Sequence, residues 1–363
     1  MLVSILVVTM CFKPEAILDQ IVHTRTQSTL AKLESSKEFE RGGRGDSQNR
    51  VRQRCSTWDC IVRLSPIEDQ ARLMTEIITP FSPWFLCDYF IGDEFQRTLG
   101  VPSQFQLDIQ EALDCTHLPS MIVLFVQVNK FDSFASNCLD NLTSPIILIT
   151  GQWHLPALKA SKTKFLLTHP LIYHWFAQNP VHVHPKLTGL PYGIRHDNLQ
   201  TLSRMISEVS PLKETTVLNL PMALTHPERA PFVVKNASKE GSKEELRVFY
   251  EKMRRSKYII SPMGDRPEAY RHWEAISFLT VPICNCPEEL KQVFGTRMLF
   301  ANQTAMLNWL NGTADLSHVE GSRKLNQDIL TNGIWAKQIK QIQAEGRRKM
   351  VCRGLDCEIH VTP

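Results

Sequence analysis

Short apolar runs alternate with amphipathic stretches along much of this chain. Residues 121–126 (MIVLFV) and 146–149 (IILI) are rich in β-branched side chains and short enough to be single strands. Runs of this type predict strands that are buried on both faces of a parallel sheet. Residues 131–142 and 171–178 are typical of short helices. The alternation predicts an α/β fold whose ligands gather at the carboxyl ends of the strands.

A second unit of the same kind is expected after residues 207–228, a stretch that contains Pro and Glu. Ser242 and Glu245 have the spacing of a capping box, which marks the start of a helix. The apolar residues that follow recur at helical spacing: Leu246, Phe249, Tyr250 and Met253. The pattern therefore predicts an amphipathic helix that packs against a sheet.

A βαβ unit is predicted next, with strands at residues 258–260 and 281–284 and a helix at residues 267–278 between them. Residues 305–310 and 325–344 also have helical patterns, and residues 352–363 are expected to be a tail.

The length and composition favour an ordinary globular protein. A chain of 363 residues corresponds to roughly two domains, and 43% hydrophobic with 21% charged residues excludes wholesale disorder, collagen and coiled coil. The charge excess of 41 − 37 = +4 is too small for a chain that chiefly neutralises a phosphate backbone, so nucleic acid is not an expected partner. We expect a signal-like or stem-like segment at 1–54, an N-terminal α/β domain at 55–205, a C-terminal α/β domain at 206–346 and a tail at 347–363.

The N-terminal segment allows several interpretations. Residues 1–12 are apolar but shorter than the ~20 residues that a membrane-spanning helix needs, so they fit a secretory signal, a buried first element or a truncated gene product. Residues 35–54 have no apolar period and are expected to be a disordered stem, with membrane attachment through this end. An RNA-binding or membrane-surface arm and an adhesion motif at Arg44–Asp46 are the alternatives.

The cysteines indicate the compartment. Ten are present, and two pairs share the spacing C-x4-C: Cys55 with Cys60, and Cys352 with Cys357. This spacing matches neither zinc nor CxxC redox motifs and favours small disulfide loops in an oxidising compartment. Four N-glycosylation sequons agree with a secretory location, at Asn141, Asn236, Asn302 and Asn311. The alternative is a cytosolic protein with free thiols.

Residues 261–275 contain the pattern that most clearly indicates a ligand-binding site. They predict a strand end at Ser261, a turn at Gly264 and a helix with Pro267 in its first turn, where the missing N–H costs nothing. Free N–H groups at a helix start bind anions such as a diphosphate, and Gly264 allows close approach to the backbone. Arg271 and Glu274 share one helix face. We expect Arg271 to bind phosphate there, while Glu274 accepts hydrogen bonds from sugar or ribose hydroxyls. An ordinary surface helix with an Arg271–Glu274 pair is the alternative.

The same residues follow the pattern S-P-x-G-x3-[D/E]-x2-R-x-W-E-A, with a proline seven positions later. This pattern resembles exostosin-like glycosyltransferases of the GT-B fold. Two further blocks are similar to that family: residues 175–194, which contain WFAQN, HPKL and GLPYGI, and residues 146–154, which end in GQWH. The likeness spans residues 120–310 and implies two Rossmann-like domains that face a cleft, with the acceptor on the first and a nucleotide sugar on the second.

The resemblance also implies roles for individual residues. Ser261, Gly264 and the helix start would face the donor diphosphate, Arg271 would neutralise it, and Glu274 would hold the ribose. Asn179 and Gly193 would line the cleft.

Four positions depart from the family pattern. Met263, Asp265 and Arg266 stand where the family has a basic residue, an Asn and a Gly, and Leu279 replaces a Gly before the second strand. Arg266 supplies the displaced positive charge, whereas Asp265 repels phosphate unless it caps the helix. We expect Leu279 to narrow the donor pocket, and these changes leave room for an inactive relative.

The sequence favours catalysis without a metal or cofactor. It contains no Asp-x-Asp pair, so the helix start, Arg271 and Arg266 are expected to stabilise the leaving group. His154, just after a predicted strand, is the candidate general base, with a purely structural histidine as the alternative. His182 and His184 have the spacing of a shared metal site but lack accompanying ligands. No G-x-G-x-x-G, P-loop or G-x-S-x-G motif is present.

Together these features predict a metal-independent glycosyltransferase of the secretory pathway, in the Golgi lumen. Its partners would be a nucleotide-sugar donor and a glycan or glycoconjugate acceptor. A catalytically inactive glycan- or nucleotide-binding protein of the same fold is the first alternative, and an unrelated α/β hydrolase-like enzyme or interaction protein is the second.

Overall fold

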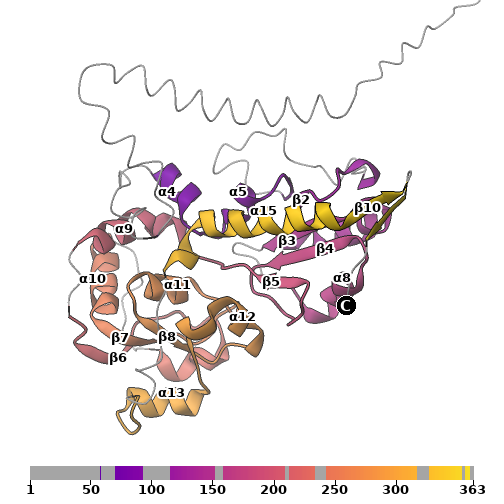
Figure 1. Cartoon of the computed structure of the whole chain (residues 1–363). Coiled ribbons are helices and arrows are strands. Elements are labelled where there is room, and N and C mark those ends of the chain that lie inside the picture. Colours follow the sequence, from indigo (N-terminus) through magenta and orange to yellow (C-terminus); the bar gives the residue numbers. More distant parts are fainter. Residues whose placement is uncertain are drawn as a thin grey trace, which may run out of the picture. The chain divides into compact units, whose positions relative to one another are not determined.

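A computed structural model describes residues 58, 70–92, 115–151, 158–208, 212–233, 243–316, 327–353 and 356–359 (Figure 1). All of them belong to one compact unit, Ser56–Pro363. The predicted signal and stem at 1–54, the Cys55–Cys60 pair, the capping Ser242 and the sequon at Asn236 lie outside the described residues. The protein is α/β and contains two parallel sheets of five and four strands, consistent with two Rossmann-like domains.

The first sheet contains five parallel strands in chain order. These strands are β1 (Tyr89–Ile91), β2 (Val123–Gln127), β3 (Ile146–Gly151), β4 (Ile172–Ala177) and β5 (Leu187–Gly189). Every residue of β2 and β3 is buried, which confirms the strands predicted from their apolar runs.

Residues 171–178, predicted to be a short helix, instead form β4, so that prediction was wrong. β4 lies between β3 and β5, and its Trp175 donates from Nε1 to Thr150 Oγ1 on β3 at 2.9 Å. A short aromatic run has no period that separates a buried strand from a buried helix. Pairing on both edges decides the structure here.

Helices cover both faces of the first sheet. On one face, α7 (Phe131–Asn137) and α8 (Ala160–Thr168) pack on a core that includes Leu124 and Leu148. α7 confirms the helix predicted at 131–142. The other face presents Phe125 and Ile149 to a core that α4, α5 and α15 help to form. These helices are α4 (Gln70–Glu76), α5 (Ser82–Leu86) and α15 (Asn332–Lys349).

Helix α15 returns from the second half of the chain to the first sheet (Figure 1). Its first residue, Asn332, donates from Nδ2 to the carbonyl oxygens of Met74, Thr75 and Ile77 at 3.1–3.2 Å. Near its end, Gln343 Nε2 donates to Met121 O at 2.7 Å. The helix predicted at 325–344 therefore starts and ends later than expected, because these contacts set its position.

An antiparallel hairpin, β10 (Met350–Arg353) and β11 (Asp356–Ile359), follows α15 within the segment predicted as a tail. Cys352 and Cys357 are Cα partners across this hairpin. Their side chains are not described, so the disulfide between them stays a prediction.

The second sheet contains four parallel strands, again in chain order. These strands are β6 (Thr215–Asn219), β7 (Ser256–Ile260), β8 (Val281–Cys284) and β9 (Leu299–Phe300). β6 lies inside residues 207–228, so a strand comes before the helix at which the α/β pattern of the second unit was expected to begin. β7 and β8 confirm the predicted βαβ unit.

Helices also cover both faces of the second sheet. α10 (Lys243–Arg254) and α11 (Tyr270–Ser277) pack on the face that carries Ile259, and α13 (Gln303–Leu310) packs on the face that carries Ile260. α10 and α13 confirm the predicted helices. The remaining helices are α9 (Leu199–Ser207) and α12 (Lys291–Phe294). Short 3-10 turns connect the elements at Cys115–His117, Val128–Lys130, Leu139–Asn141, His196–Asn198, Pro227–Phe232, Glu288–Leu290, Gly295–Arg297 and Asp328–Leu330.

Leu279 lies at the end of α11 and adopts a left-handed conformation, with φ of 56°. Its N–H donates to Ile276 O at 3.0 Å, and the N–H of Thr280 donates to Ala275 O at 2.9 Å, which is the Schellman motif that glycine favours. Because it precedes the amino end of β8, it lies at the opposite edge of the sheet from the turn after β7. The expectation that Leu279 narrows a donor pocket was therefore wrong.

Replacing Leu279 with Gly is expected to raise the free energy of unfolding by about 1 kcal/mol. The substitution removes the Cβ repulsion of the left-handed conformation, and the larger backbone entropy of glycine offsets part of that gain. Urea unfolding measures the change; a Leu279→Gly variant less stable than the wild type would contradict it.

The part of the chain that the structure describes contains two disulfides, Cys115–Cys138 and Cys284–Cys286, at sequence separations of 23 and 2. In the first disulfide, Cys115 begins the 3-10 turn before β2, and Cys138 lies at the end of α7. Both cysteines are buried. In the loop-entropy model a bridge of this span contributes about 3 kcal/mol.

We expect the double variant Cys115→Ala, Cys138→Ala to unfold at a lower urea concentration, with a loss of about 3 kcal/mol. The denaturant slope is expected to rise, because the unfolded chain without the bridge is less compact and exposes more surface. A loss below about 1 kcal/mol would show that the bridge does not constrain the unfolded chain in this way.

Candidate functional site

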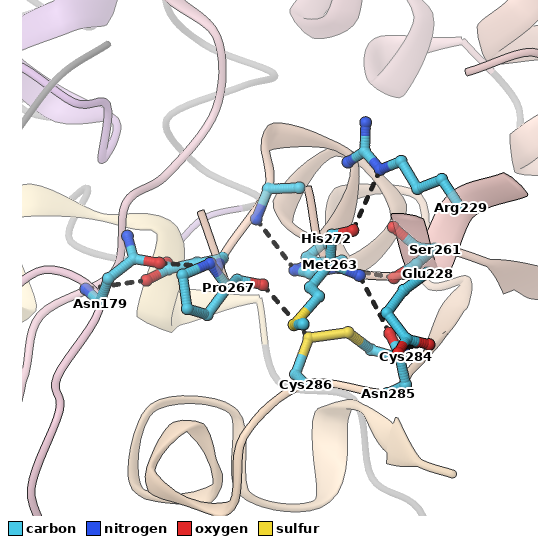
Figure 2. Close-up of a disulfide and its surroundings, with 12 residues drawn as sticks. Asn179, Glu228, Arg229, Ser261, Met263, Pro267, His272, Cys284, Asn285 and Cys286 are labelled. Carbon is cyan, nitrogen blue, oxygen red and sulfur yellow. Dashed lines mark hydrogen bonds between the residues drawn. A yellow bond between two sulfur atoms is a disulfide. The ribbon is translucent and has the colours of Figure 1, made fainter. Parts of the chain in front are cut away.

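The carboxylate of Glu268 joins loops that follow strands of the two sheets. It is 1% exposed and accepts hydrogen bonds from the backbone N–H groups of Tyr192 and Asn179 and from Nε1 of Trp273. The N–H of Glu268 in turn donates to Asn179 Oδ1 at 2.6 Å (Figure 2). Two segments far apart in the sequence are thus held together by reciprocal bonds.

These contacts bring together the carboxyl ends of both sheets. Asn179 follows β4, Tyr192 follows β5, and Glu268 lies in the loop after β7. Asn179 has φ of 50°, a left-handed conformation that asparagine tolerates better than most residues. A ligand site in a parallel sheet usually lies where the strand order reverses. The described strands show no reversal within either sheet, so the junction between the sheets is the candidate site.

Burial raises the pKa of Glu268 to about 8, although the N–H donors and Arg266 act in the opposite direction. Burial also raises the pKa of Tyr192 and Tyr270, whose hydroxyl groups lie 3.2 Å apart. Near neutral pH the junction therefore contains two neutral phenols and a carboxyl group that readily holds a proton.

Arg266 supplies positive charge at this junction. Its Nη1 donates to Tyr192 Oη at 2.5 Å, and its guanidinium lies 4.9 Å from the centre of the Tyr192 ring. Its Nη2 lies 3.4 Å from Asp265, whose side chain is 57% exposed. Asp265 therefore points largely to solvent rather than capping a helix.

Arg229 supplies a second cation, on the turn at Gly264. Its Nε donates to Met263 O at 3.2 Å (Figure 2). Its Nη1 donates to Ala223 O at the same distance. A Cβ on Gly264 would lie 2.5 Å from Arg229 Nη2, so glycine is required for this approach. The Gly264 N–H itself donates to Arg266 O at 3.0 Å. The close approach that glycine permits is thus occupied by a guanidinium in this structure.

Helix α11 begins at Tyr270, so the prediction that Pro267 lies in its first turn was wrong. The preceding Ala269 is extended, and its N–H donates to His272 Nδ1 at 3.2 Å. His272 Nε2 lies 2.9 Å from Ser261 O and donates to it, because Nδ1 is the acceptor (Figure 2). Burial lowers the pKa of His272 to about 3, so the ring is neutral. Ser261 is thereby tied to the helix start.

Arg271 and Glu274 both lie at the junction but have partners within the protein. Arg271 donates to the carbonyl oxygens of Leu220 and Pro221, directly after β6. Glu274 Oε1 accepts from Tyr250 Oη at 2.8 Å and from Asn198 Nδ2 at 3.2 Å.

Three other residues singled out in the sequence, Gly193, His182 and His184, contact other parts of the described chain. Gly193 has φ of 85°, and a Cβ there would lie 2.4 Å from Ile78 O, so this glycine serves close backbone packing. His154 lies outside the described residues. His182 Nε2 lies 2.9 Å from Thr163 Oγ1, whereas His184 Nδ1 accepts from the N–H of Lys186.

Within the described ranges, one group has the composition of a metal site. The ligand atoms of His272, Cys284 and Cys286 lie within 4.8 Å of one another. The two sulfurs form a disulfide, and both nitrogens of His272 are hydrogen-bonded. These atoms cannot bind a metal as they stand.

Sequence reasoning assigned no role to Glu268, Tyr192 or Arg229. Glu268 occupies the [D/E] position of the motif, which was the available signal. Arg229 lies in Pro227–Phe232, a turn that has no motif of its own and reaches Gly264 only through the fold.

No known protein family and no curated protein matches this chain at significant similarity. The resemblance to exostosin-like glycosyltransferases therefore depends on the sequence motif. No helix within the described residues is both long and apolar enough to cross a bilayer.

The junction predicts a specific dependence of stability on pH. The Glu268 carboxyl titrates near 4.5 in the unfolded chain and near 8 in the folded protein. Its stabilising contribution is complete below pH 4.5 and is lost as the pH rises through 8, because the folded state holds the proton longer. Glu268→Gln removes this dependence.

We expect the difference in unfolding free energy, wild type minus Glu268→Gln, to fall by on the order of 4 kcal/mol between these pH values. Urea unfolding of both proteins over the pH series measures it. A difference that stays constant, or grows with pH, would show that Glu268 is ionised throughout.

Proposed function

We propose that this protein is a metal-independent glycosyltransferase of GT-B type in the secretory pathway, in the Golgi lumen. It would transfer a sugar from a nucleotide sugar to a glycan or glycoconjugate, with the donor on the second sheet and the acceptor on the first.

One observation carries the proposal: two guanidinium groups, of Arg229 and Arg266, flank the turn at Gly264 where the carboxyl ends of both sheets meet. The hydrogen-bond partners of Arg229 within the described chain are backbone carbonyls. Its guanidinium is partly buried, and the nearby carboxylate of Asp265 favours its charged form. An anionic ligand would compete with Asp265 for this guanidinium. The two guanidinium groups together suit the diphosphate of a nucleotide sugar, which would compete with Asp265, 3.4 Å from Arg266 Nη2.

In this proposal the protein's own residues stabilise the leaving group. Arg229 and Arg266 take the negative charge that develops on the diphosphate as the bond to the sugar breaks. Ser261 and Gly264 position the turn, and Glu274 holds the ribose. Arg271 acts indirectly, because it keeps the loop after β6 in place through Leu220 and Pro221. His154 would act as the base for the acceptor hydroxyl.

A binding protein without catalytic activity is the second candidate, and one feature favours it. The N–H of Gly264 is bonded to Arg266 O, and Arg229 covers the same glycine. Because its N–H group already has an acceptor, this turn would bind a ligand through the charge of the arginine side chains. It would not offer a backbone N–H to the leaving group.

Titration calorimetry with UDP, GDP and CMP tests the proposal. We expect one nucleotide to bind, and Arg229→Ala and Arg266→Ala each to weaken binding by about 10- to 100-fold, the worth of a charged hydrogen bond. Arg255→Ala is the matched control, because it removes an exposed arginine that pairs with Glu214 and Glu251 at the end of α10.

The outcomes separate the candidates. Binding that survives both substitutions, or no binding at all, contradicts the placement of the donor site. Binding without hydrolysis or transfer of the sugar to any glycan acceptor supports the inactive binding protein.

A further inference from the structure

The disulfide between Cys284 and Cys286 lies directly at the carboxyl end of β8 and spans one residue, Asn285 (Figure 2). Stabilisation by a disulfide through the unfolded state grows with loop length, so a bridge this short contributes least in that way. We therefore expect its main effect on the folded protein to be local, on the position of Asn285.

Asn285 holds the turn after β7. Its Oδ1 accepts from the Met263 N–H at 3.1 Å, and its Nδ2 donates to Glu228 Oε2 at 2.9 Å. Met263 O accepts from Arg229, so the backbone on both sides of this residue is fixed (Figure 2). The order of the turn thus depends on where Asn285 sits.

The disulfide sets that position. The Cα atoms of Cys284 and Cys286 are 5.2 Å apart, whereas an extended strand separates Cα atoms two residues apart by about 6.6 Å. If the chain extends here after the bridge is broken, Asn285 moves away from Met263 and Glu228.

The two sulfurs differ in access. Cys284 is fully buried, whereas Cys286 is 8% exposed, and its sulfur lies 3.2 Å from Pro267 O. Both cysteines are buried, and Cys286 is the more exposed of the two, so we expect a reductant to attack its sulfur rather than that of Cys284. By contrast, Cys115 and Cys138 of the other disulfide are 1% and 0% exposed.

We propose that Cys284–Cys286 is a thiol–disulfide exchange site that controls the order of residues 261–266. The thiolate of a dithiol reductant attacks Cys286 Sγ, forms a mixed disulfide and releases Cys284 as a thiolate, which takes up a proton. The second thiol of the reductant then attacks the reductant sulfur of the mixed disulfide. The two reductant sulfurs form a disulfide with each other, and Cys286 is released as a thiol. The oxidised protein has the ordered turn and the reduced protein the loosened one.

This site regulates nucleotide binding if the proposed function holds, because Arg229 and Gly264 belong to the same turn. That consequence rests on the proposed function, whereas the effect on the turn does not.

The test uses the oxidised full-length protein and graded dithiothreitol without denaturant. Alkylation and peptide mass spectrometry report which cysteines open, and hydrogen exchange reports the Met263 amide. We expect Cys284 and Cys286 to be alkylated before Cys115 and Cys138, with Met263 exchange about tenfold faster, as the loss of one hydrogen bond predicts. Reoxidation is expected to restore slow exchange.

Variants separate the bridge from its consequence. Asn285→Ala is expected to accelerate Met263 exchange in the oxidised protein, whereas Glu228→Gln keeps an acceptor oxygen for Asn285 Nδ2 and leaves that exchange within about threefold of the wild type. Cys284→Ser with Cys286→Ser is expected to show fast exchange that dithiothreitol no longer changes.

Two results overturn the proposal: a Cys284–Cys286 bridge that opens only on global unfolding, or one that opens while Met263 exchange stays unchanged. Nucleotide affinity, measured in both redox states, is a separate readout. If no nucleotide binds, the proposed function fails while the exchange data still decide the role of the disulfide.

Discussion

The buried carboxyl of Glu268 organises the junction on which the rest of this structure depends. Removing a carboxyl group from water is costly unless hydrogen bonds replace the lost hydration. Tyr192, Asn179 and Trp273 provide those bonds, and two of the three belong to loops after the first sheet. One side chain therefore specifies where the carboxyl ends of two separately formed sheets meet.

Positive charge gathers at the same place by a different route. Arg266 is a neighbour of Glu268 in the sequence, whereas Arg229 arrives from the connection after β6 and packs on Gly264. The absence of a Cβ on Gly264 is what allows this approach. The motif that suggested a backbone site for an anion thus becomes, in the folded chain, a turn covered by a guanidinium and held from the other side by Asn285 and a disulfide.

The sequence predicted much of the fold for physical reasons that are local. β-branched runs such as 121–126 favour strands that are buried on both faces, and the apolar spacing from Leu246 to Met253 suits a helix. Local patterns gave wrong predictions where contacts distant in the chain decide the structure. β4 is a strand because β3 and β5 pair with its two edges. α11 starts later than predicted because the N–H groups of Glu268 and Ala269 donate to Asn179 and His272. Leu279 shows the same limit, since its distance from the turn depends on strand direction.

Composition and periodicity by themselves predicted an α/β protein with parallel strands, which the structure contains in two sheets. The segment around Gly264 stays a prediction from its motif as the place for chemistry. The α/β pattern follows from which side chains avoid water, a property that each stretch carries with it. Only the tertiary structure decided that Arg229 reaches this turn, that Glu268 closes the junction, and that Gly193 serves packing instead. Contacts between residues far apart in the chain depend on the angles at which sheets and helices pack, and no local pattern encodes those angles.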